Sequence, residues 1–524
     1  MFIINTSPLS THKTFDDYAG FLFQRWATRS QFQFKASEIH IIFDHPNRHG
    51  ISPKDIERSR RDQNCKRIIP GTCTCISDKT DLPKTNWRHF LSDRVQKRNL
   101  VNFLSEKFLE LAQSKFHEKN CIVVTSGGFE GENKDKAFGS SPEKGIFVIS
   151  HLSANHEEGD TVWFHAFKST ANRLIIYSPD TDTFFIGLPL IKKLTGKSIF
   201  VQLKKFSFDS EFIDMTVLTD CLAHDLLLQG IADVEKCMQN VYIMGGCDFV
   251  SFFRGYGKKS FFDSFRKNAA FISSNLAGDG SDGLCSFYKL MLCTYFSKHR
   301  AAFQPAVSVQ ELVTKLSSSD KSENSTLISV IKHFREKMWE RVSTETDMLP
   351  NADALQLHWK RCLWVSKYWQ QSVDSVMSLP PLTDFGWSTD DNILSVIWDT
   401  EANVKRVNDT IQWYTKGCSC KKGCLTNKCS CRRSRVGGQT GYCRPGCKCI
   451  NCENVQHPCV PHVSPDEDPH SDITELNDEE DNDDDDKSDT EDDTVVDSVD
   501  TLPNDIFTEY WDVLEEEQDE TGFK

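Results

Sequence analysis

The sequence predicts an α/β fold for residues 1–300, in which a parallel sheet carries helices on both faces. Short apolar runs rich in β-branched residues recur along this part of the chain, at 38–43, 121–125, 146–150, 173–177, 198–203 and 241–244. Helical stretches, for example 87–112 and 216–230, lie between these runs. Alternation of this kind is typical of a parallel sheet covered by helices.

Three further segments follow the α/β body. Residues 301–415 are expected to form a helical extension and connector, with a helical pattern over 310–371 and a strand-bearing link over 387–413. The extension carries an aromatic stripe, which core packing explains better than base stacking: Leu355, Leu357, Trp359, Leu363, Trp364, Tyr368 and Trp369. A cysteine-rich module spans 416–453 and an acidic tail spans 460–524.

The length of 524 residues and the 38% hydrophobic content allow two or three domains. No stretch approaches the roughly 18 apolar residues of a membrane span, so the sequence predicts no membrane partner.

Acidic residues follow three of the predicted strands. Asp44 ends the first, Asp180 and Asp182 follow 173–177, and Asp248 follows 241–244. A further acidic group, Glu157, Glu158 and Asp160, precedes 173–177. Ligands of such sheets bind beyond the carboxyl ends of the strands, and carboxylates gathered there repel one another unless cations neutralise them.

Two readings of these acids stay open from spacing alone. Two divalent ions, Mg²⁺ or Mn²⁺, about 3.5–4 Å apart, would hold both the attacking and the leaving oxygen of a phosphodiester. Each acid taken singly also suits an ordinary turn or helix cap.

Five short motif blocks follow one another along the α/β body: I-F-D at 42–44 with P-K at 53–54 and E-R-S-R-R at 57–61, H-E-E-G-D at 156–160, S-P-D-T-D at 178–182, G-C-D-F at 246–249 and R-G-Y-G-K-K at 254–259. In order and approximate spacing, between 44 and 265, they resemble the motifs of flap endonucleases and the wider XPG group. The resemblance implies a PIN-like nuclease fold that cuts DNA near flaps or junctions.

The resemblance also implies roles for individual residues. The metal ligands would be Asp44, Glu158, Asp160, Asp180, Asp182 and Asp248. Lys54 and Arg58 would approach the scissile phosphate, and the turn residues Gly255, Gly257, Lys258 and Lys259 would contact duplex phosphates.

One position departs from the family pattern. An Asp ends the first strand of the family, and Asn5 stands at the best match here. Two function classes therefore stay open: a metal-dependent, structure-selective nuclease, or an inactive nuclease fold kept as a DNA- or chromatin-binding protein.

Nine cysteines lie between 418 and 452, at 418, 420, 424, 429, 431, 443, 447, 449 and 452. Three tetrahedral zinc ions need twelve ligand positions, and nine thiolates fill them if three sulfurs each bridge two metals. A disulfide network would need an oxidising compartment and would leave one cysteine unpaired. No signal-peptide pattern is visible, which favours a reducing intracellular compartment. The ligands predicted for about three structural zinc ions are Cys418, Cys420, Cys424, Cys429, Cys431, Cys443, Cys447, Cys449 and Cys452.

Nine basic side chains and no acid lie between 416 and 452. With three zinc ions bound, the module would keep a charge near +6, which suits a phosphate backbone. The segment resembles the CXC module of the tesmin/TSO1 family, which implies DNA binding and a nuclear location. The side chains expected at DNA are Lys421, Lys422, Arg432, Arg433, Arg435 and Arg444, with Tyr442 or Arg444 as the candidate for minor-groove entry. The joined order of nuclease-like body, helical region and CXC module resembles transposon-associated CXC proteins.

The last 60 residues carry an opposite charge. Residues 465–524 hold 27 acids and two lysines, a net charge of −25, which leaves +10 on the rest of the chain. Such a segment is expected to be disordered. An aromatic and aliphatic group at 506–514 within it either docks on a protein partner or on the basic body, or is a solvated end. Three other cysteines, at 65, 73 and 75, are expected to be free thiols rather than a metal site.

Overall fold

The computed structural model of the chain describes residues 6–45, 50–56, 58, 59, 76–83, 86–116, 120–178, 180–202, 212–272, 276, 278–317, 322–339, 347–391, 393–415, 418–420, 422–426, 428–433, 435, 436, 439–443, 447, 448, 450–452 and 454. It describes the backbone alone at 160, 161, 410–415, 422, 423, 435, 436, 439, 440 and 450–452. Asn5, Cys65, Cys73, Cys75 and the acidic tail lie outside these ranges. The chain divides into two compact units, Met1–Thr400 and Glu401–Lys524.

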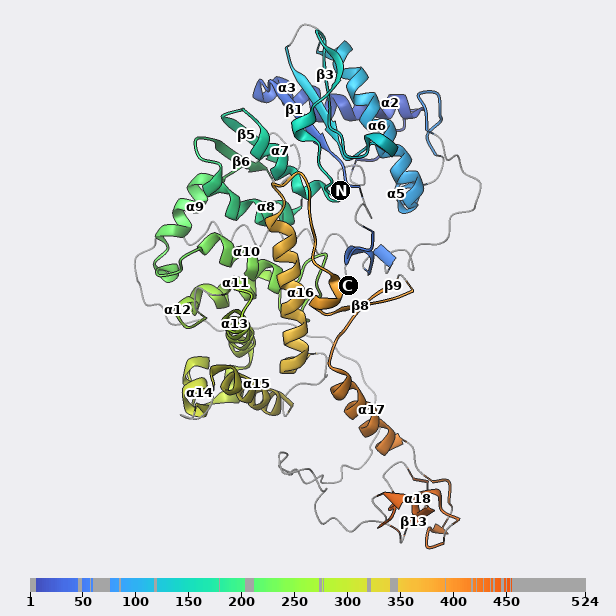
Figure 1. The fold of residues 1–524 in the computed structure, drawn as a ribbon, viewed down its shortest axis with the longest axis vertical. Helices are drawn as coiled ribbons and strands as arrows, with labels where there is room; N and C mark the ends of the chain where they lie inside the picture. The colour runs from blue at the N-terminus through green and yellow to red at the C-terminus, as the bar shows by residue number, and fades with distance from the viewer. Residues whose placement is uncertain are drawn as a thin grey trace, which may run out of the picture. The chain divides into compact units, whose positions relative to one another are not determined.

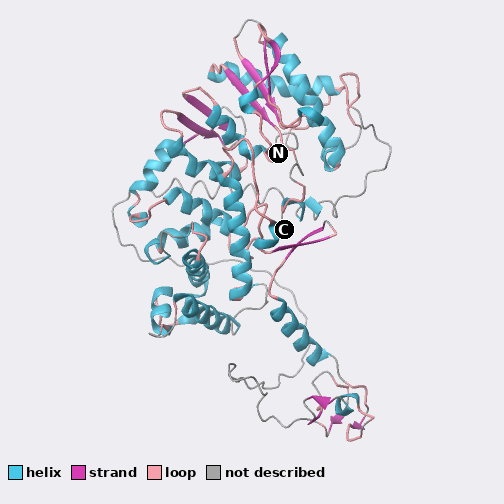
Figure 2. Cartoon of the chain, viewed as in Figure 1, coloured by secondary structure: helices cyan, strands magenta, loops and turns pink. Residues whose placement is uncertain are grey.

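The first sheet has four strands in the order β1-β2-β3-β4 (Figures 1 and 2): β1 Glu38–Ile42, β2 Ile122–Ser126, β3 Phe138–Ser141 and β4 Gly145–Val148. β1 and β2 run parallel, whereas β3 and β4 add antiparallel. A parallel pair needs a long crossover, which α5 (Trp87–Ser92) and α6 (Arg94–Lys115) supply between β1 and β2. The short link from β3 to β4 permits only a hairpin.

The core beside this sheet comes from two helices. α2 (Phe15–Phe23) begins at a capping box between Thr14 and Asp17 and continues through the π-helical turn η1 (Gln24–Thr28) into α3 (Arg29–Phe34). α2 packs against α6. The buried side chains that they share with β1 and β2 include Phe15, Tyr18, Leu22, Phe23, Leu100, Leu104, Phe108 and Val123.

The second sheet has three strands in the order β5-β6-β7: β5 Arg173–Tyr177, β6 Ser198–Gln202 and β7 Ile213–Asp214. β5 and β6 are parallel and β7 is antiparallel. The helices around it are α7 Trp163–Lys168, α8 Thr181–Gly187, η5 Leu188–Lys193, α9 Met215–His224 and η6 Leu226–Leu228.

The mixed α/β class predicted from the sequence is therefore confirmed. The prediction of a single parallel sheet is wrong for the described residues, because the parallel pairs β1–β2 and β5–β6 lie in two separate mixed sheets and the run predicted at 146–150 forms the antiparallel strand β4.

The strand predicted at 241–244 is also wrong. These residues end α10 (Val234–Met244), which begins at the cap residue Asp233 and ends at Gly245. Every residue of α10 is buried. The last four residues of α10 are all apolar, and so short an apolar run cannot distinguish a helix end from a buried strand.

Six more helices complete the first unit: α11 Lys258–Lys267, α12 Ala269–Ile272, α13 Ser281–His299, α14 Val309–Leu316, α15 Glu323–Trp339 and α16 Ala352–Gln370. α16 packs on α10 and α13 (Figure 1). Its aromatic side chains Trp359, Trp364, Tyr368 and Trp369 are buried, which confirms that the stripe is core. Short 3-10 segments connect elements of this unit: η2 Gly131–Asn133, η3 Ser150–Leu152, η4 Gly159–Val162, η8 Arg300–Phe303 and η10 Leu382–Phe385.

The predicted strand-bearing link is a hairpin of β8 (Trp387–Asp390) and β9 (Ile393–Val396), which ends the first unit. The second unit contains α17 (Glu401–Thr415) and the cysteine module. In the module β10 (Lys422–Gly423) pairs with β13 (Ile450–Cys452), β11 (Arg435–Val436) pairs with β12 (Gln439–Thr440), and α18 is Ser430–Arg433. None of the described helices has the length and apolar character needed to cross a membrane.

Candidate metal centres

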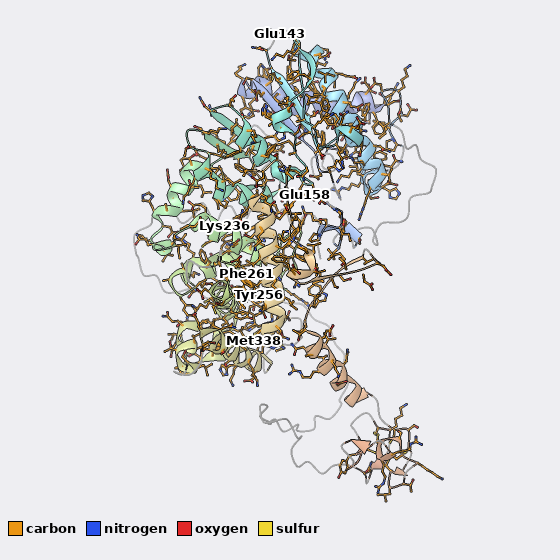
Figure 3. All side chains as sticks on the ribbon, viewed as in Figure 1. Glu143, Glu158, Lys236, Tyr256, Phe261 and Met338 are labelled. Carbon is orange, nitrogen blue, oxygen red and sulfur yellow. The ribbon has the colours of Figure 1, made fainter. Side chains whose placement is uncertain are left out.

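Carboxylates from four separate segments gather in the first unit. Asp44 directly follows β1, and Glu158 lies just before η4 (labelled in Figure 3). Asp180 is the N-cap of α8 and Asp182 lies in its first turn, so both follow β5. Asp248 follows α10 rather than a strand. The side chain of Asp160 lies outside the described part, so its predicted role stays a prediction.

Asp44 is fixed by the segment that carries Glu158. The Gly159 N–H donates to Asp44 Oδ1 at 2.7 Å, and the His45 N–H donates to the carbonyl of Glu157 at 2.7 Å. A Cβ at position 159 would lie 3.0 Å from the same carboxylate oxygen, so glycine suits this close approach. Burial alone would raise the pKa of Asp44, but the charges of Lys97 and Lys54 and the Gly159 N–H hold it below its usual range.

Two cations from one helical stretch neutralise part of the cluster. The buried Lys54 ammonium lies 3.3 Å from Glu158 Oε2 and 3.6 Å from Asp248 Oδ2. Arg58 donates to Glu158 Oε1 at 2.9 Å and to Glu157 Oε1 at 3.1 Å. Both residues predicted at the phosphate therefore lie beside the carboxylates, and both contact them directly.

Two buried acids of the cluster have raised pKa values. Burial raises the pKa of Glu158 to about 7, with Asp44 adding to the shift and Lys54 and Arg58 opposing it. Burial also raises the pKa of Asp182 to about 7, followed by repulsion from Asp180 and Asp248. Like charges held close together in a buried site produce shifts of this direction.

The donor set fits a hard divalent cation. All its atoms are carboxylate oxygens, and Asp44, Glu158, Asp180, Asp182 and Asp248 outnumber the cations beside them. Asp248 is the most open of them, with 44% of its side chain exposed. Among the described residues, however, these oxygens do not converge within 4.8 Å, as the thiolates of the second unit do. The Lys54 ammonium already pairs with both Glu158 and Asp248.

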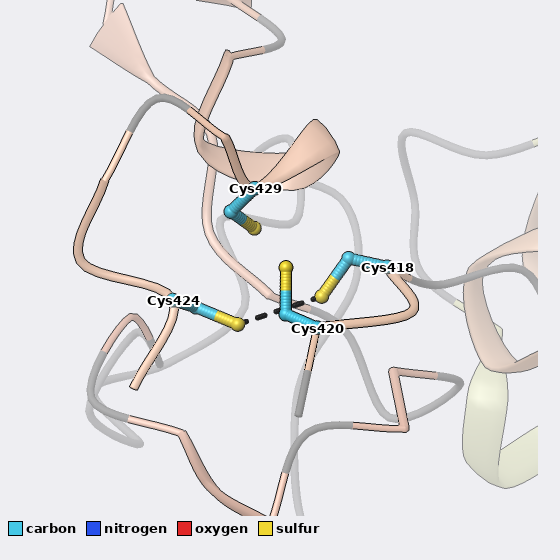
Figure 4. Close-up of side chains that lie close together, drawn as sticks. All are labelled: Cys418, Cys420, Cys424 and Cys429. Atoms are coloured by element: carbon cyan, nitrogen blue, oxygen red, sulfur yellow. Dashed lines mark hydrogen bonds between the residues drawn. The ribbon is translucent and has the colours of Figure 1, made fainter. Parts of the chain in front are cut away.

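The cysteine module contains two groups of four thiols whose sulfurs lie within 4.8 Å of one another: Cys418, Cys420, Cys424 and Cys429 (Figure 4), and Cys418, Cys431, Cys443 and Cys447. The sulfur of Cys418 belongs to both groups. It lies 3.5 Å from that of Cys424 and 3.9 Å from that of Cys443. Four convergent thiols are the ligand set of structural zinc, so the module can hold zinc, as predicted. The side chains of Cys449 and Cys452 lie outside the described part.

Several N–H groups point at these sulfurs. The Cys418 N–H donates to Cys447 Sγ at 3.2 Å, and the buried Asn454 amide donates to Cys443 Sγ at 3.5 Å. Burial opposes ionisation of Cys429, but the Arg432 N–H and the sulfurs of Cys443 and Cys418 lower the pKa of this thiol to about 6. Such donors stabilise thiolates, the form that binds metal.

The residues predicted at DNA fall into three sets. Tyr442 is 46% exposed, and Arg433 is exposed and Arg432 half-buried on the short helix α18. Lys421 and Arg444 lie outside the described residues, and the side chains of Lys422 and Arg435 are not described. In the first unit, Gly255 has a φ of +75° in an exposed turn, and Gly257 is the N-cap of α11. Lys259 lies half-buried in the first turn of that helix.

The Lys258 side chain, which was predicted to contact duplex phosphates, contacts other parts of the fold instead. Its ammonium donates to the carbonyl oxygens of Tyr242 and Gly246 at the end of α10 and lies 3.5 Å from the centre of the Tyr242 ring. It is an internal contact of the fold in this structure.

The sequence analysis missed Tyr242, which hydrogen-bonds to Asp182, and did not assign Glu157, which pairs with Arg58. The assignment of 241–244 to a strand hid Tyr242, and its contacts with α8 depend on tertiary packing. No family model matches the chain, and no curated protein matches it.

Proposed function

We propose that this protein is a DNA-binding protein whose α/β body is a divalent-metal-dependent, structure-selective nuclease of PIN-like fold. The observation that carries the proposal is the grouping of Asp44, Glu158, Asp180, Asp182 and Asp248 near Lys54, because acids that merely cap helices or form turns need not lie beside one buried cation. Buried carboxylates with raised pKa values mark sites that bind cations. The resemblance of five motifs to flap endonucleases supports the same function.

The residues would act as follows. Asp44, Glu158, Asp160, Asp180, Asp182 and Asp248 would hold two Mg²⁺ or Mn²⁺ ions, which supply stabilisation of the attacking and leaving oxygens of a phosphodiester. Lys54 and Arg58 are the cations nearest the carboxylates. Lys54 and Arg58 would contact the scissile phosphate once bound metal ions neutralise the carboxylates in their place.

A specific observation favours the second candidate, a nuclease fold that binds DNA without cutting it. Lys54 already pairs with Glu158 and Asp248, and no three of the described carboxylates bring their oxygens within 4.8 Å of one another. Asn5 brings no charge where the resembling family has an Asp.

A cleavage assay with Mg²⁺ and Mn²⁺ on labelled flaps, junctions and single strands tests the proposal. Asp180→Ala removes a ligand and a charge from the cluster, so we expect it to abolish cleavage while DNA binding through the cysteine module persists. Asn5→Asp is expected to raise cleavage. Asp220→Ala, an exposed acid on α9, is the matched control and should cut like the wild type.

Inert wild-type protein in both metals, together with inert Asn5→Asp, would decide for the binding-only alternative. Cleavage that survives Asp180→Ala unchanged would show that the activity does not arise from this cluster.

In the same proposal, the cysteine module binds DNA and so brings the α/β body to it. Cys418 is shared by both thiol groups, and Cys429 of the first lies 3.7 Å from Cys443 of the second. A third zinc ion held by Cys429, Cys443, Cys449 and Cys452 would make Cys418, Cys429 and Cys443 the three bridging sulfurs that the count of nine requires. The surrounding basic residues would bind DNA phosphates, and a nuclear location belongs to the same proposal.

A further inference from the structure

Tyr242 joins the candidate metal cluster to the turn before α11. It lies on the buried helix α10 and is 5% exposed. Its hydroxyl donates to Asp182 Oδ1 at 2.7 Å and lies 2.6 Å from Thr181 Oγ1. A phenol has one proton, so the bond to Asp182 requires that Thr181 donates to the Tyr242 oxygen. The Thr181 hydroxyl then strengthens Tyr242 as a donor.

The Tyr242 ring is held from both sides. Phe185 of α8 stacks on it, with ring centres 4.1 Å apart and planes at 19°. The Lys258 ammonium lies over the ring, 3.5 Å from its centre, and also donates to the carbonyl oxygens of Tyr242 and Gly246. Lys258 is the first residue of α11, directly after the turn that contains Gly255 and Gly257.

The contact with Tyr242 fixes one oxygen of Asp182. Burial raises the pKa of the Tyr242 phenol well above its ordinary value, so the hydroxyl keeps its proton and acts as a donor. Its hydrogen bond lowers the pKa of Asp182, against the larger effect of burial. Among the described residues, no other side chain hydrogen-bonds to the Asp182 carboxylate. The Tyr242 hydroxyl therefore sets the direction of this carboxylate.

A purely structural role would not require the hydroxyl. Phe185 and Phe262 fill the same core with unsubstituted rings, 5.5 Å apart, and a phenylalanine at 242 would preserve the stacking. The hydroxyl adds a directed contact to one carboxylate.

We propose that Tyr242 is a positioning residue that orients Asp182 for a divalent cation, and that Lys258 anchors Tyr242 to the turn before α11. The inference rests on the proposed metal site. Contacts in the outer shell of a metal site contribute roughly 10–100-fold to metal affinity or activity.

The test is Mn²⁺ binding to the full chain, measured by calorimetry between pH 6 and 8.5. Tyr242→Phe removes only the hydroxyl. We expect it to weaken Mn²⁺ binding by about tenfold or more and to move the pH dependence of binding to higher pH, since protons then compete better for Asp182. Lys258→Met, which keeps the aliphatic stem, should weaken binding less and in the same direction.

Tyr288→Phe is the matched control. Its hydroxyl is also part-buried and donates to the carbonyl of Ala352 at 2.9 Å, away from the cluster. It should lose a similar buried hydrogen bond and bind Mn²⁺ with wild-type affinity and pH dependence. If a general loss of stability caused the weaker Mn²⁺ binding, Tyr242→Phe and Tyr288→Phe would lose affinity alike.

The outcomes separate the two proposals. Wild-type affinity and pH dependence in Tyr242→Phe, alongside lost binding in Asp182→Asn, would overturn the role of Tyr242 and leave the metal site standing. Wild-type binding in Lys258→Met alone would overturn the link to the turn. Wild-type protein that binds no Mn²⁺ across the pH range would overturn the metal site and the inference together.

Discussion

At the scale of single residues, Lys54 sets the electrostatic balance of the carboxylate cluster. It is buried, lies between Glu158 and Asp248, and its ammonium is 4.7 Å from the centre of the Phe249 ring. Such a contact stabilises a desolvated cation. Burial is the main cause of the raised pKa values of about 7 at Glu158 and Asp182, and Lys54 only partly opposes it.

The raised pKa values of Glu158 and Asp182 predict how the free energy of unfolding depends on pH. Their folded pKa values lie above the ordinary carboxyl values, so the folded protein binds more protons than the unfolded chain between about pH 4 and 7. The free energy of unfolding should therefore fall as pH rises through this window, by at most about 1.4 kcal/mol per pH unit for each group. Urea unfolding at pH 5.5 and 8 in a chelator measures the fall.

Asp182→Asn should flatten this fall, because an amide does not titrate. Asp220→Asn, an exposed carboxylate on α9, should keep the wild-type slope. Equal slopes in wild type and Asp182→Asn would mean that Asp182 is ionised throughout the range and that burial does not shift it.

At the scale of elements, the sequence predicted most of the strands that carry the site. The runs at β1, β2, β5 and β6 are rich in β-branched residues and bounded by polar residues, so their pattern is local. The carboxylates after β1 and β5 could be placed for the same reason. α10 was misassigned because its last four residues, all apolar, match a strand when considered alone, whereas the polar residues at 235, 236, 239 and 240 give the whole segment a helical period.

The inward direction of Lys258 could not be predicted either. The turn at 254–259 is readable from its glycines, but the ammonium of Lys258 binds carbonyl oxygens at the end of α10, and that contact depends on tertiary packing. The direction of a strand is likewise set by its neighbours. β4 has a strand pattern, and the short link to β3 makes it antiparallel.

The shared position of Cys418 predicts unequal effects of cysteine substitutions. Cys418 belongs to both thiol groups, whereas Cys420 belongs to one. Structural zinc contributes folding free energy directly, so Cys418→Ser should release more zinc than Cys420→Ser and should weaken binding to duplex DNA more. Zinc content by mass spectrometry and DNA binding across a salt series measure both effects.

Cys221→Ser is the control, since Cys221 is an exposed free cysteine on α9. It should keep the zinc content and DNA affinity of the wild type. Equal zinc loss in Cys418→Ser and Cys420→Ser would contradict a bridging sulfur at Cys418, and a flat response of DNA binding to salt would argue against phosphate contacts.

At the scale of the whole molecule, the charge is divided along the chain. The net charge of −15 combines −25 in residues 465–524 with +10 in the rest. Nine of the basic residues lie between 416 and 452, beside the thiol groups. A polyanionic segment joined to a basic DNA-binding surface competes with DNA for that surface, and the tether keeps its local concentration high.

Deletion of residues 465–524 should therefore tighten binding to non-specific duplex DNA and speed association. The gain should be largest at about 50 mM salt and shrink as salt rises, because screening weakens attraction between tail and body. A tail of the same length with its Asp and Glu residues replaced by Asn and Gln separates charge from bulk, and it should bind DNA like the deletion. If the wild type, the deletion and the neutral tail bind alike at low salt, the tail does not inhibit DNA binding, and its acidic residues serve solubility or a protein partner instead.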